Sequence, residues 1–152
     1  MSRPQLTELR IADPTALWEA LGFSVADEHV NLGGVNIVLG APGEGITRWS
    51  IYGIPPTNDI DGLPTTTDVP APQPQNAEHP NGAIGLDHVV ITTPDFDRTA
   101  RALDAHGLPL TSILGRIVVL RFRGRLSRWE PEAELAAVEP GDRGGLVGEA
   151  GV

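Results

Sequence analysis

A short pattern near the N-terminus returns further along the chain, and this repetition limits the folds open to the protein more than any other feature. The segment LDHVVITTP aligns without a gap on LTELRIADP, so that Leu86 falls on Leu6 and Pro94 on Pro14, an offset of 80 positions. In both copies alternating apolar residues, which are typical of a strand, lead into a helical pattern. The sequence therefore predicts one structural unit that is used twice.

The first copy predicts the element order strand, helix, strand, strand, strand. Asp13 and Pro14 mark the helix start, because an Asp carboxylate can accept from free backbone N–H groups and proline suits the first helical position. Gly22 is expected to end the helix. Three strand-like runs follow, with a tight turn at Gly33-Gly34 between the first two: EHVNLGG, VNIVLGA and ITRWSIYGI. The helix carries its apolar residues at helical spacing: Leu17, Trp18 and Leu21.

The second copy predicts a helix that is capped by Asp95 and ended by Gly107, then one strand in GRIVVLRFRG. Between the copies, seven of the 27 residues from 55 to 81 are proline, so we expect an extended connector that forms neither a helix nor a ladder. The connector ends in HPNG, a strong turn signal in which His79 is interpreted as a turn residue. The chain is divided into a first module, a connector, a second module and a tail: 5–54, 55–81, 82–125 and 126–152.

Composition excludes several classes of partner and site. The net charge of −9 argues against a nucleic-acid partner, which requires a basic face. No apolar run approaches the roughly 20 residues of a membrane span, and the first residues contain no apolar signal core, so neither a membrane partner nor a location outside the cytoplasm is expected. The absence of cysteine excludes disulfides, thiolate metal sites and a cysteine nucleophile.

Residues 5 to about 110 resemble a known superfamily. The segment DHVVITTPDFDRTARALDAHGL resembles the opening of a glyoxalase-like module of the vicinal oxygen chelate (VOC) superfamily. The HPNG-x3-LDHVV entry and the proline-rich connector resemble a bacterial two-module subfamily of that group. The resemblance implies an α+β fold in which two βαβββ modules of the glyoxalase/bleomycin-resistance type curl into a cup around a small ligand.

The resemblance also implies candidate ligands for a metal. Catalytic members place a divalent metal inside the cup and hold it with residues of the first and last strands of a module. His88 matches the first-strand histidine of the second module, and Glu8 takes the equivalent position in the first. Imidazole and carboxylate groups suit Fe, Mn, Ni, Zn or Co in an open site. Trp49 and Tyr52 lie in the last strand of the first module with opposite facing, so one of them should line the concave side and suit a planar or apolar ligand. Packing in the core is the alternative for these aromatic residues, and it is slightly favoured.

The chain departs from the superfamily pattern in both last strands. ITRWSIYGI contains no Glu, and Arg121 and Arg123 stand where a carboxylate would be wanted in the second module. Reading AELAAVEP as a strand would bring Glu134 into the ligand position, although its composition favours a short helix. Two explanations stay open for residues after about 115, which hold six of the 11 arginines. Either they form a divergent final pair of strands, or they are out of register with the ancestral coding frame.

The tail bears on function because an altered frame would leave the second module incomplete at its C-terminal end. The module would then need a partner chain, as in a homodimer, or would expose a sheet edge. The expected function is binding of a small organic molecule in the cup between the modules, with catalysis left open. The alternatives are a metal-dependent lyase, isomerase or dioxygenase that uses His88 and Glu8, and a non-catalytic copy that serves as a dimer partner.

Overall fold

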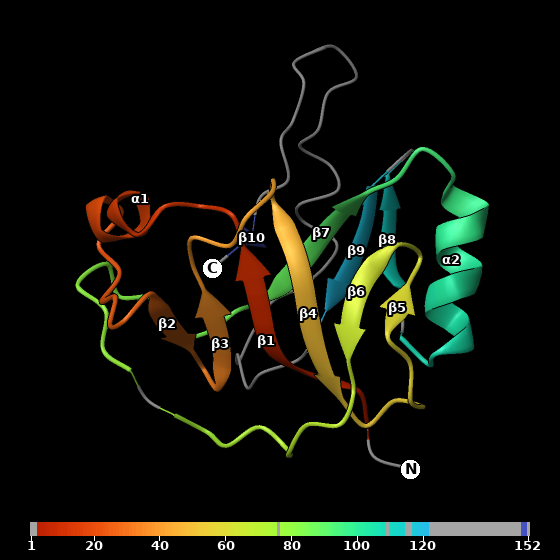
Figure 1. Ribbon diagram of the computed structural model, residues 1–152, viewed down its shortest axis with the longest axis horizontal. Coiled ribbons are helices and arrows are strands. Elements are labelled where there is room, and N and C mark those ends of the chain that lie inside the picture. The colour runs from red at the N-terminus through yellow and green to blue at the C-terminus, as the bar shows by residue number, and fades with distance from the viewer. Residues whose placement is uncertain (1–2, 76, 109, 115–116, 122–149, 152) are drawn as a thin grey trace.

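The computed structural model describes residues 3–75, 77–108, 110–114, 117–121 and 150–151 (Figure 1). The fold is α+β, with few helices and a mixed six-stranded sheet. The elements are β1 (Gln5–Ile11), α1 (Thr15–Ala20), β2 (His29–Leu32), β3 (Val35–Val38), β4 (Ile46–Tyr52), β5 (Asp59–Ile60), β6 (Leu63–Thr66), β7 (His88–Thr92), α2 (Phe96–Ala105), β8 (Leu110–Leu114), β9 (Ile117–Arg121) and β10 (Ala150–Gly151). No helix in these ranges is long and apolar enough to cross a bilayer.

The strands form two sheets. The larger sheet has the order β2-β3-β1-β4-β6-β5, and the smaller one has the order β10-β7-β9-β8. The strand order β2-β3-β1-β4 therefore has a counterpart in β8-β9-β7-β10. The strand directions differ, because β1 runs parallel to β3 whereas β7 runs antiparallel to β9. The α+β class is confirmed, and the elements from β1 to β4 follow the predicted order strand, helix, strand, strand, strand.

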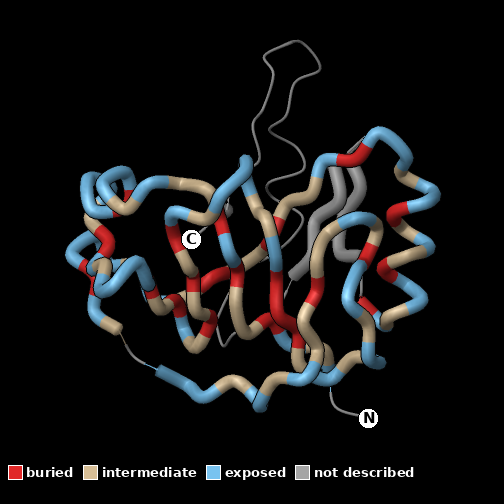
Figure 2. The backbone as a smooth tube through the Cα atoms, viewed as in Figure 1, coloured by how far each residue is buried: buried red, intermediate tan, exposed pale blue. Residues whose placement is uncertain are grey.

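One hydrophobic core joins the two sheets. Leu9 and Trp49, which are cross-strand partners on β1 and β4, are each 1% exposed. Val89 on β7 and Leu103 on α2 belong to the same cluster of buried residues. Figure 2 shows buried positions recurring along the strands and exposed positions concentrated in the loops. Burial of this apolar surface is the main favourable term that holds the second sheet against the first.

Helix α1 begins as predicted but is not capped as predicted. Pro14 occupies the N-cap position, and no side chain accepts a hydrogen bond from the first turn. The expectation that Asp13 caps the helix is wrong, because its Oδ2 instead accepts from the indole Nε1 of Trp18 at 3.0 Å. Gly22, with φ of 85°, ends the helix as expected.

Helix α2 confirms the prediction made for it. The Asp95 carboxylate accepts from the backbone N of Arg98 at 3.0 Å, and Asp95 has the extended backbone of an N-cap residue. Gly107, with φ of 68°, follows the helix end. The strand predicted in GRIVVLRFRG is present as β9, whereas Arg123 lies outside the described residues.

The prediction that residues 55–81 form no ladder is wrong for residues 59–66. Asp61 and Gly62 both have positive φ and form a tight turn between β5 and β6. β6 pairs with β4 through Thr65 and Thr66, so the missing N–H of Pro64 is not required in that ladder. A local turn and two threonines therefore override the proline content, and the first sheet gains two strands.

The HPNG turn is present, but His79 does more than form it. Gly82 N donates to His79 O at 2.8 Å, which closes the predicted turn. The His79 ring is 7% exposed, its Nδ1 accepts from Ser24 N at 3.0 Å, and its Nε2 lies 2.7 Å from Asn31 O. Because Nδ1 accepts, Nε2 must carry the proton and donate to the carbonyl. His79 therefore ties the end of the connector to Ser24, which follows α1, and to Asn31 on β2.

Candidate functional site

A cavity, called the larger cavity below, lies where the two sheets meet. Its volume is about 630 Å³, and it is bounded by the end of β1, helix α1, the start of β4, the β5–β6 turn and β7. Its polar side chains are Asp13, Asp61 and Thr92. The rest of its lining is mostly apolar: Ile11, Leu17, Trp18, Leu21, Phe23, Ile46, Leu63, Val90 and Ile91.

Helix α1 and its C-cap residue present two leucines to this cavity, Leu17 and Leu21. Trp18 is buried at 6% exposure and stacks at a tilt on Phe23, with ring centroids 4.7 Å apart. Leu17 and Leu21 line the cavity and remain 47% and 58% exposed. The helix has only six residues, so its buried face holds one large side chain and the next apolar positions fall at the cavity. Their helical spacing was recognised from the sequence, but their exposure was not.

Asp13 adds a carboxylate to the apolar wall. Its Oδ2 accepts from the indole of Trp18, and its backbone carbonyl accepts from Gly40 N at 2.8 Å. These two bonds hold the residue between the end of β1 and the start of α1. Sequence reasoning interpreted Asp13 as a helix cap; the signal that it serves otherwise was the Trp five positions later, within reach of the carboxylate.

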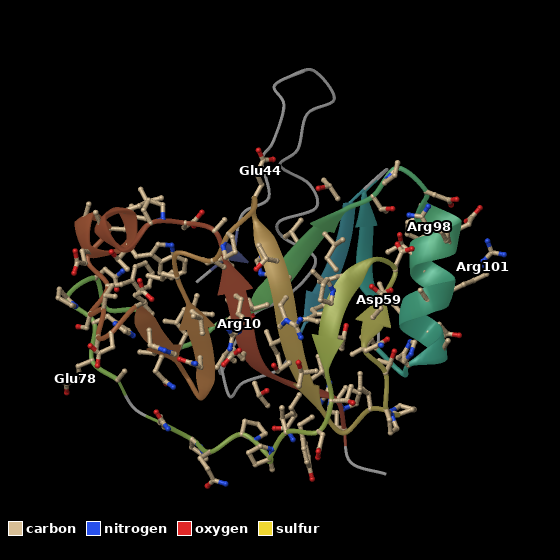
Figure 3. The ribbon with its side chains drawn as sticks, viewed as in Figure 1. Arg10, Glu44, Asp59, Glu78, Arg98 and Arg101 are labelled. Carbon is tan, nitrogen blue, oxygen red and sulfur yellow. The ribbon has the colours of Figure 1, made fainter. Side chains whose placement is uncertain are left out.

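Asp61 is the second carboxylate of the cavity, and it is paired. Arg98 Nε lies 2.6 Å from Asp61 Oδ1, and Thr99 Oγ1 donates to Oδ2. Figure 3 shows Arg98 in α2 next to the β5–β6 turn, while Arg101 on the same helix points away from the sheets. The hydrogen bond from Arg98 lowers the pKa of Asp61 below its ordinary value of 3.8, against an opposing effect of burial. The pair links the first sheet to α2.

This pairing predicts an acid-dependent loss of stability. Because the pKa of Asp61 is lower in the folded state, its contribution is fully present above about pH 4 and is lost as the pH falls through the folded-state pKa. We expect Asp61→Asn to lower the free energy of unfolding at pH 7 and to flatten its dependence on pH below 4. Urea melts between pH 2.5 and 7 measure this, with Asp59→Asn at the neighbouring exposed carboxylate as the control. If the free energy of unfolding of Asp61→Asn fell below pH 4 as steeply as that of the wild-type protein, Asp61 would not be the source of the acid-dependent loss.

A smaller cavity of about 300 Å³ lies between the first sheet and residues 69–75 of the connector. Glu8 lines it together with Asn36 and Ser50. The Glu8 carboxylate accepts from Arg10 Nε at 2.9 Å and from Asn36 Nδ2 at 3.3 Å. This carboxylate therefore already has two protein partners.

The other residues singled out from the sequence lie apart from both cavities. His88 is the first residue of β7, and its Nδ1 lies 2.9 Å from Asp87 Oδ2. Trp49 is buried in the core and donates through Nε1 to Thr65 Oγ1 at 2.7 Å. Tyr52 ends β4 and is half-buried. Neither cavity lining includes any of these three residues. Glu134 lies outside the described residues.

A divalent metal would need several donor side chains that converge on one point. Within the described ranges, no group of three or more His, Asp or Glu side chains is positioned to hold a metal ion. His88 and Glu8 alone, the latter engaged by Arg10 and Asn36, do not make such a site. The Fe, Mn, Ni, Zn or Co centre implied by the resemblance thus stays a prediction. Analysis of metal content in protein purified without chelator, with His88→Ala as the variant, would test it.

Comparison with known proteins leaves the larger cavity as the main guide to function. No protein-family model, curated protein or solved structure matches the chain. Function must therefore be argued from the geometry of the cavity and from the chemistry of its lining.

Proposed function

We propose that this is a glyoxalase-like protein that binds a small organic molecule in the cavity between its two sheets. The observation that carries the proposal is an apolar cavity of about 630 Å³ to which both sheets and α1 contribute. Volumes of roughly 300–1,000 Å³, apolar walls and a few polar groups are characteristic of sites for small molecules. The alternative of metal-dependent catalysis has less support, because the described donors do not complete a metal site.

The exposed leucines support a ligand rather than simple core packing. Leu17 and Leu21 would each lose contact with water if a molecule filled the cavity, and removal of apolar surface from water contributes roughly 25 cal/mol per Å². Trp18 and Phe23 supply flat surfaces at the same site. An aromatic or other apolar molecule of one to two rings suits such a lining.

The arrangement of strands supports the two-module part of the proposal. In the first sheet β1 lies between β3 and β4, and β2 lies outside β3. In the second sheet β7 lies between β9 and β10, and β8 lies outside β9. The cavity draws residues from β1 and β7, the two strands that carry the repeated sequence pattern. A ligand at this place would contact both copies of the unit. The antiparallel pairing of β7 with β9 is one feature that distinguishes the second copy from the first.

Thermal melting in the presence of a panel of mono- and bicyclic aromatic fragments tests the proposed function. A fragment that binds the folded state raises the melting temperature, and at 100 times its dissociation constant the stabilisation is about 2.7 kcal/mol. We expect at least one family of fragments to give a saturable rise of several degrees. Absence of any saturable shift across the panel would contradict the proposed function.

A double variant at the mouth of the cavity locates the binding. Leu17→Gln with Leu21→Gln removes apolar lining at two exposed positions, so we expect a well-folded protein whose fragment affinity is about tenfold weaker. Ile84→Gln is the matched control, because Ile84 is 69% exposed and lies outside the cavity lining. Calorimetric titration measures both. Equal losses in the two variants would place the binding elsewhere.

A further inference from the structure

We infer that the ligand of the larger cavity is a lipophilic molecule with a protonated amine, and that Asp13 is the residue that selects it. The inference rests on the proposed function and adds to it the charge of the ligand. Its basis is a carboxylate in an apolar wall with no cationic side chain against it in the described structure.

The hydrogen bonds of Asp13 leave part of the carboxylate available. Oδ2 accepts from Trp18 Nε1 at 3.0 Å, whereas Oδ1 has no protein hydrogen-bond partner among the described residues. An ionised carboxylate offers about four acceptor sites on its two oxygens, so a single indole N–H leaves most of this capacity unused. The indole also fixes the orientation of the carboxylate. A ligand N–H group could therefore bind without a rearrangement of the protein.

The two carboxylates of the cavity differ in their charge balance. Asp61 is neutralised by the Arg98 guanidinium at 2.6 Å, with a further bond from Thr99. The other close contacts between a basic and an acidic side chain in the described structure are Arg10 with Glu8 and His88 with Asp87, and neither includes Asp13. Asp13 is thus the cavity carboxylate that lacks a counter-charge within the described ranges. A cation complements it, while an anionic ligand would be repelled.

The surrounding rings favour the same class of ligand. Trp18 and Phe23 line the cavity beside Asp13, and aromatic faces attract ammonium groups. The apolar residues on β7 together with Leu17 and Leu21 can accommodate the hydrophobic part of the molecule. Charge recognition at one end of the cavity and apolar contact over the rest describe a lipophilic amine, in contrast to a polyol or a carboxylic acid.

Three probes of nearly equal shape test the inference: 2-naphthylmethylamine, 2-naphthylmethanol and 2-naphthoate. At pH 7 and low salt we expect the amine to bind about ten- to a hundredfold more tightly than the alcohol, the range that a hydrogen bond between charged groups supplies, and the acid to bind most weakly. Calorimetric titration of the wild-type protein measures all three. The preference for the amine should shrink at roughly 0.5 M salt, while the affinity for the alcohol stays constant.

Asp13→Asn assigns the preference to one side chain. The amide oxygen can still accept from the Trp18 indole, so the fold is retained, and we expect the amine and the alcohol to bind this variant with equal affinity. Glu19→Gln removes the same charge from an exposed position on α1 outside the cavity lining and should keep the wild-type preference. Circular dichroism melts establish that both variants are folded.

The outcomes separate the inference from the proposed function. Equal affinity of the wild-type protein for amine and alcohol, or a preference that survives in Asp13→Asn, overturns the inference and leaves small-molecule binding intact. A wild-type amine preference that salt does not weaken also overturns it. If none of the three probes, nor any fragment of the larger panel, binds saturably, the proposed function falls together with the inference.

Discussion

His79→Ala is expected to lower the free energy of unfolding by about 2–4 kcal/mol, because the substitution leaves two backbone groups without partners and opens a void beside Phe23. The lost bonds are those from Ser24 N to Nδ1 and from Nε2 to Asn31 O. The ring also packs edge-on against Phe23, with centroids 5.5 Å apart. Urea denaturation followed by tryptophan fluorescence measures the change.

His29→Ala provides the comparison, since His29 is exposed and its Nδ1 lies 3.0 Å from the side-chain oxygen of Asn36. We expect this variant to change stability by less than about 0.5 kcal/mol. Gly82 closes the turn through the backbone of His79, so the turn itself can persist in His79→Ala. A stability loss no greater than that of His29→Ala would show that the ring is not the element that holds the connector in place.

Gly34→Ala is expected to cost about 2–4 kcal/mol through two separate effects. Gly34 has φ of 95°, a conformation that disfavours a side chain, and a Cβ atom there would lie 2.8 Å from the carbonyl oxygen of Gln73. This close approach is to a backbone atom and not to a flexible side chain, so residues 73–74 of the connector must move away from the β2–β3 turn. We therefore also expect faster proteolysis of the connector in this variant.

Gly62→Ala separates these effects, because Gly62 has a similar φ of 87° but a Cβ atom there would meet no other atom within 4 Å. It should show the conformational cost alone, about 1–2 kcal/mol, without increased cleavage of residues 69–75. Equal stability losses in the two glycine variants would mean that the connector does not press on the β2–β3 turn. Denaturant melts and limited proteolysis of both proteins make the comparison.

Local sequence signals predicted the elements whose causes are themselves local. The Asp95 cap, the glycines that follow both helices and the Gly33-Gly34 turn depend on φ angles and hydrogen bonds within a few residues. The alternation in β1 likewise predicted a strand, and its apolar residues Leu6, Leu9 and Ile11 are buried. Such features could be recognised without knowledge of what packs against them.

The connector shows where local reasoning fails. Its proline content predicted an unpaired chain, yet residues 59–66 add two strands to the first sheet because β4 offers an edge for Thr65 and Thr66. His79 was interpreted as a turn residue because the two backbone groups that it binds are 55 and 48 positions away in the sequence. No pattern within the connector carries that information.

The sequence by itself determined the α+β class and the order strand, helix, strand, strand, strand over the first part of the chain. Tertiary structure decided which side chains face the cavity: Asp13 binds the Trp18 indole and does not cap the helix, and Trp49 is buried in the core. The physical reason is that hydrophobic periodicity specifies which face of an element avoids water, but not what that face meets. The partners of a carboxylate or an imidazole are set by the packing of distant segments, and they are known only when the sheets are placed together.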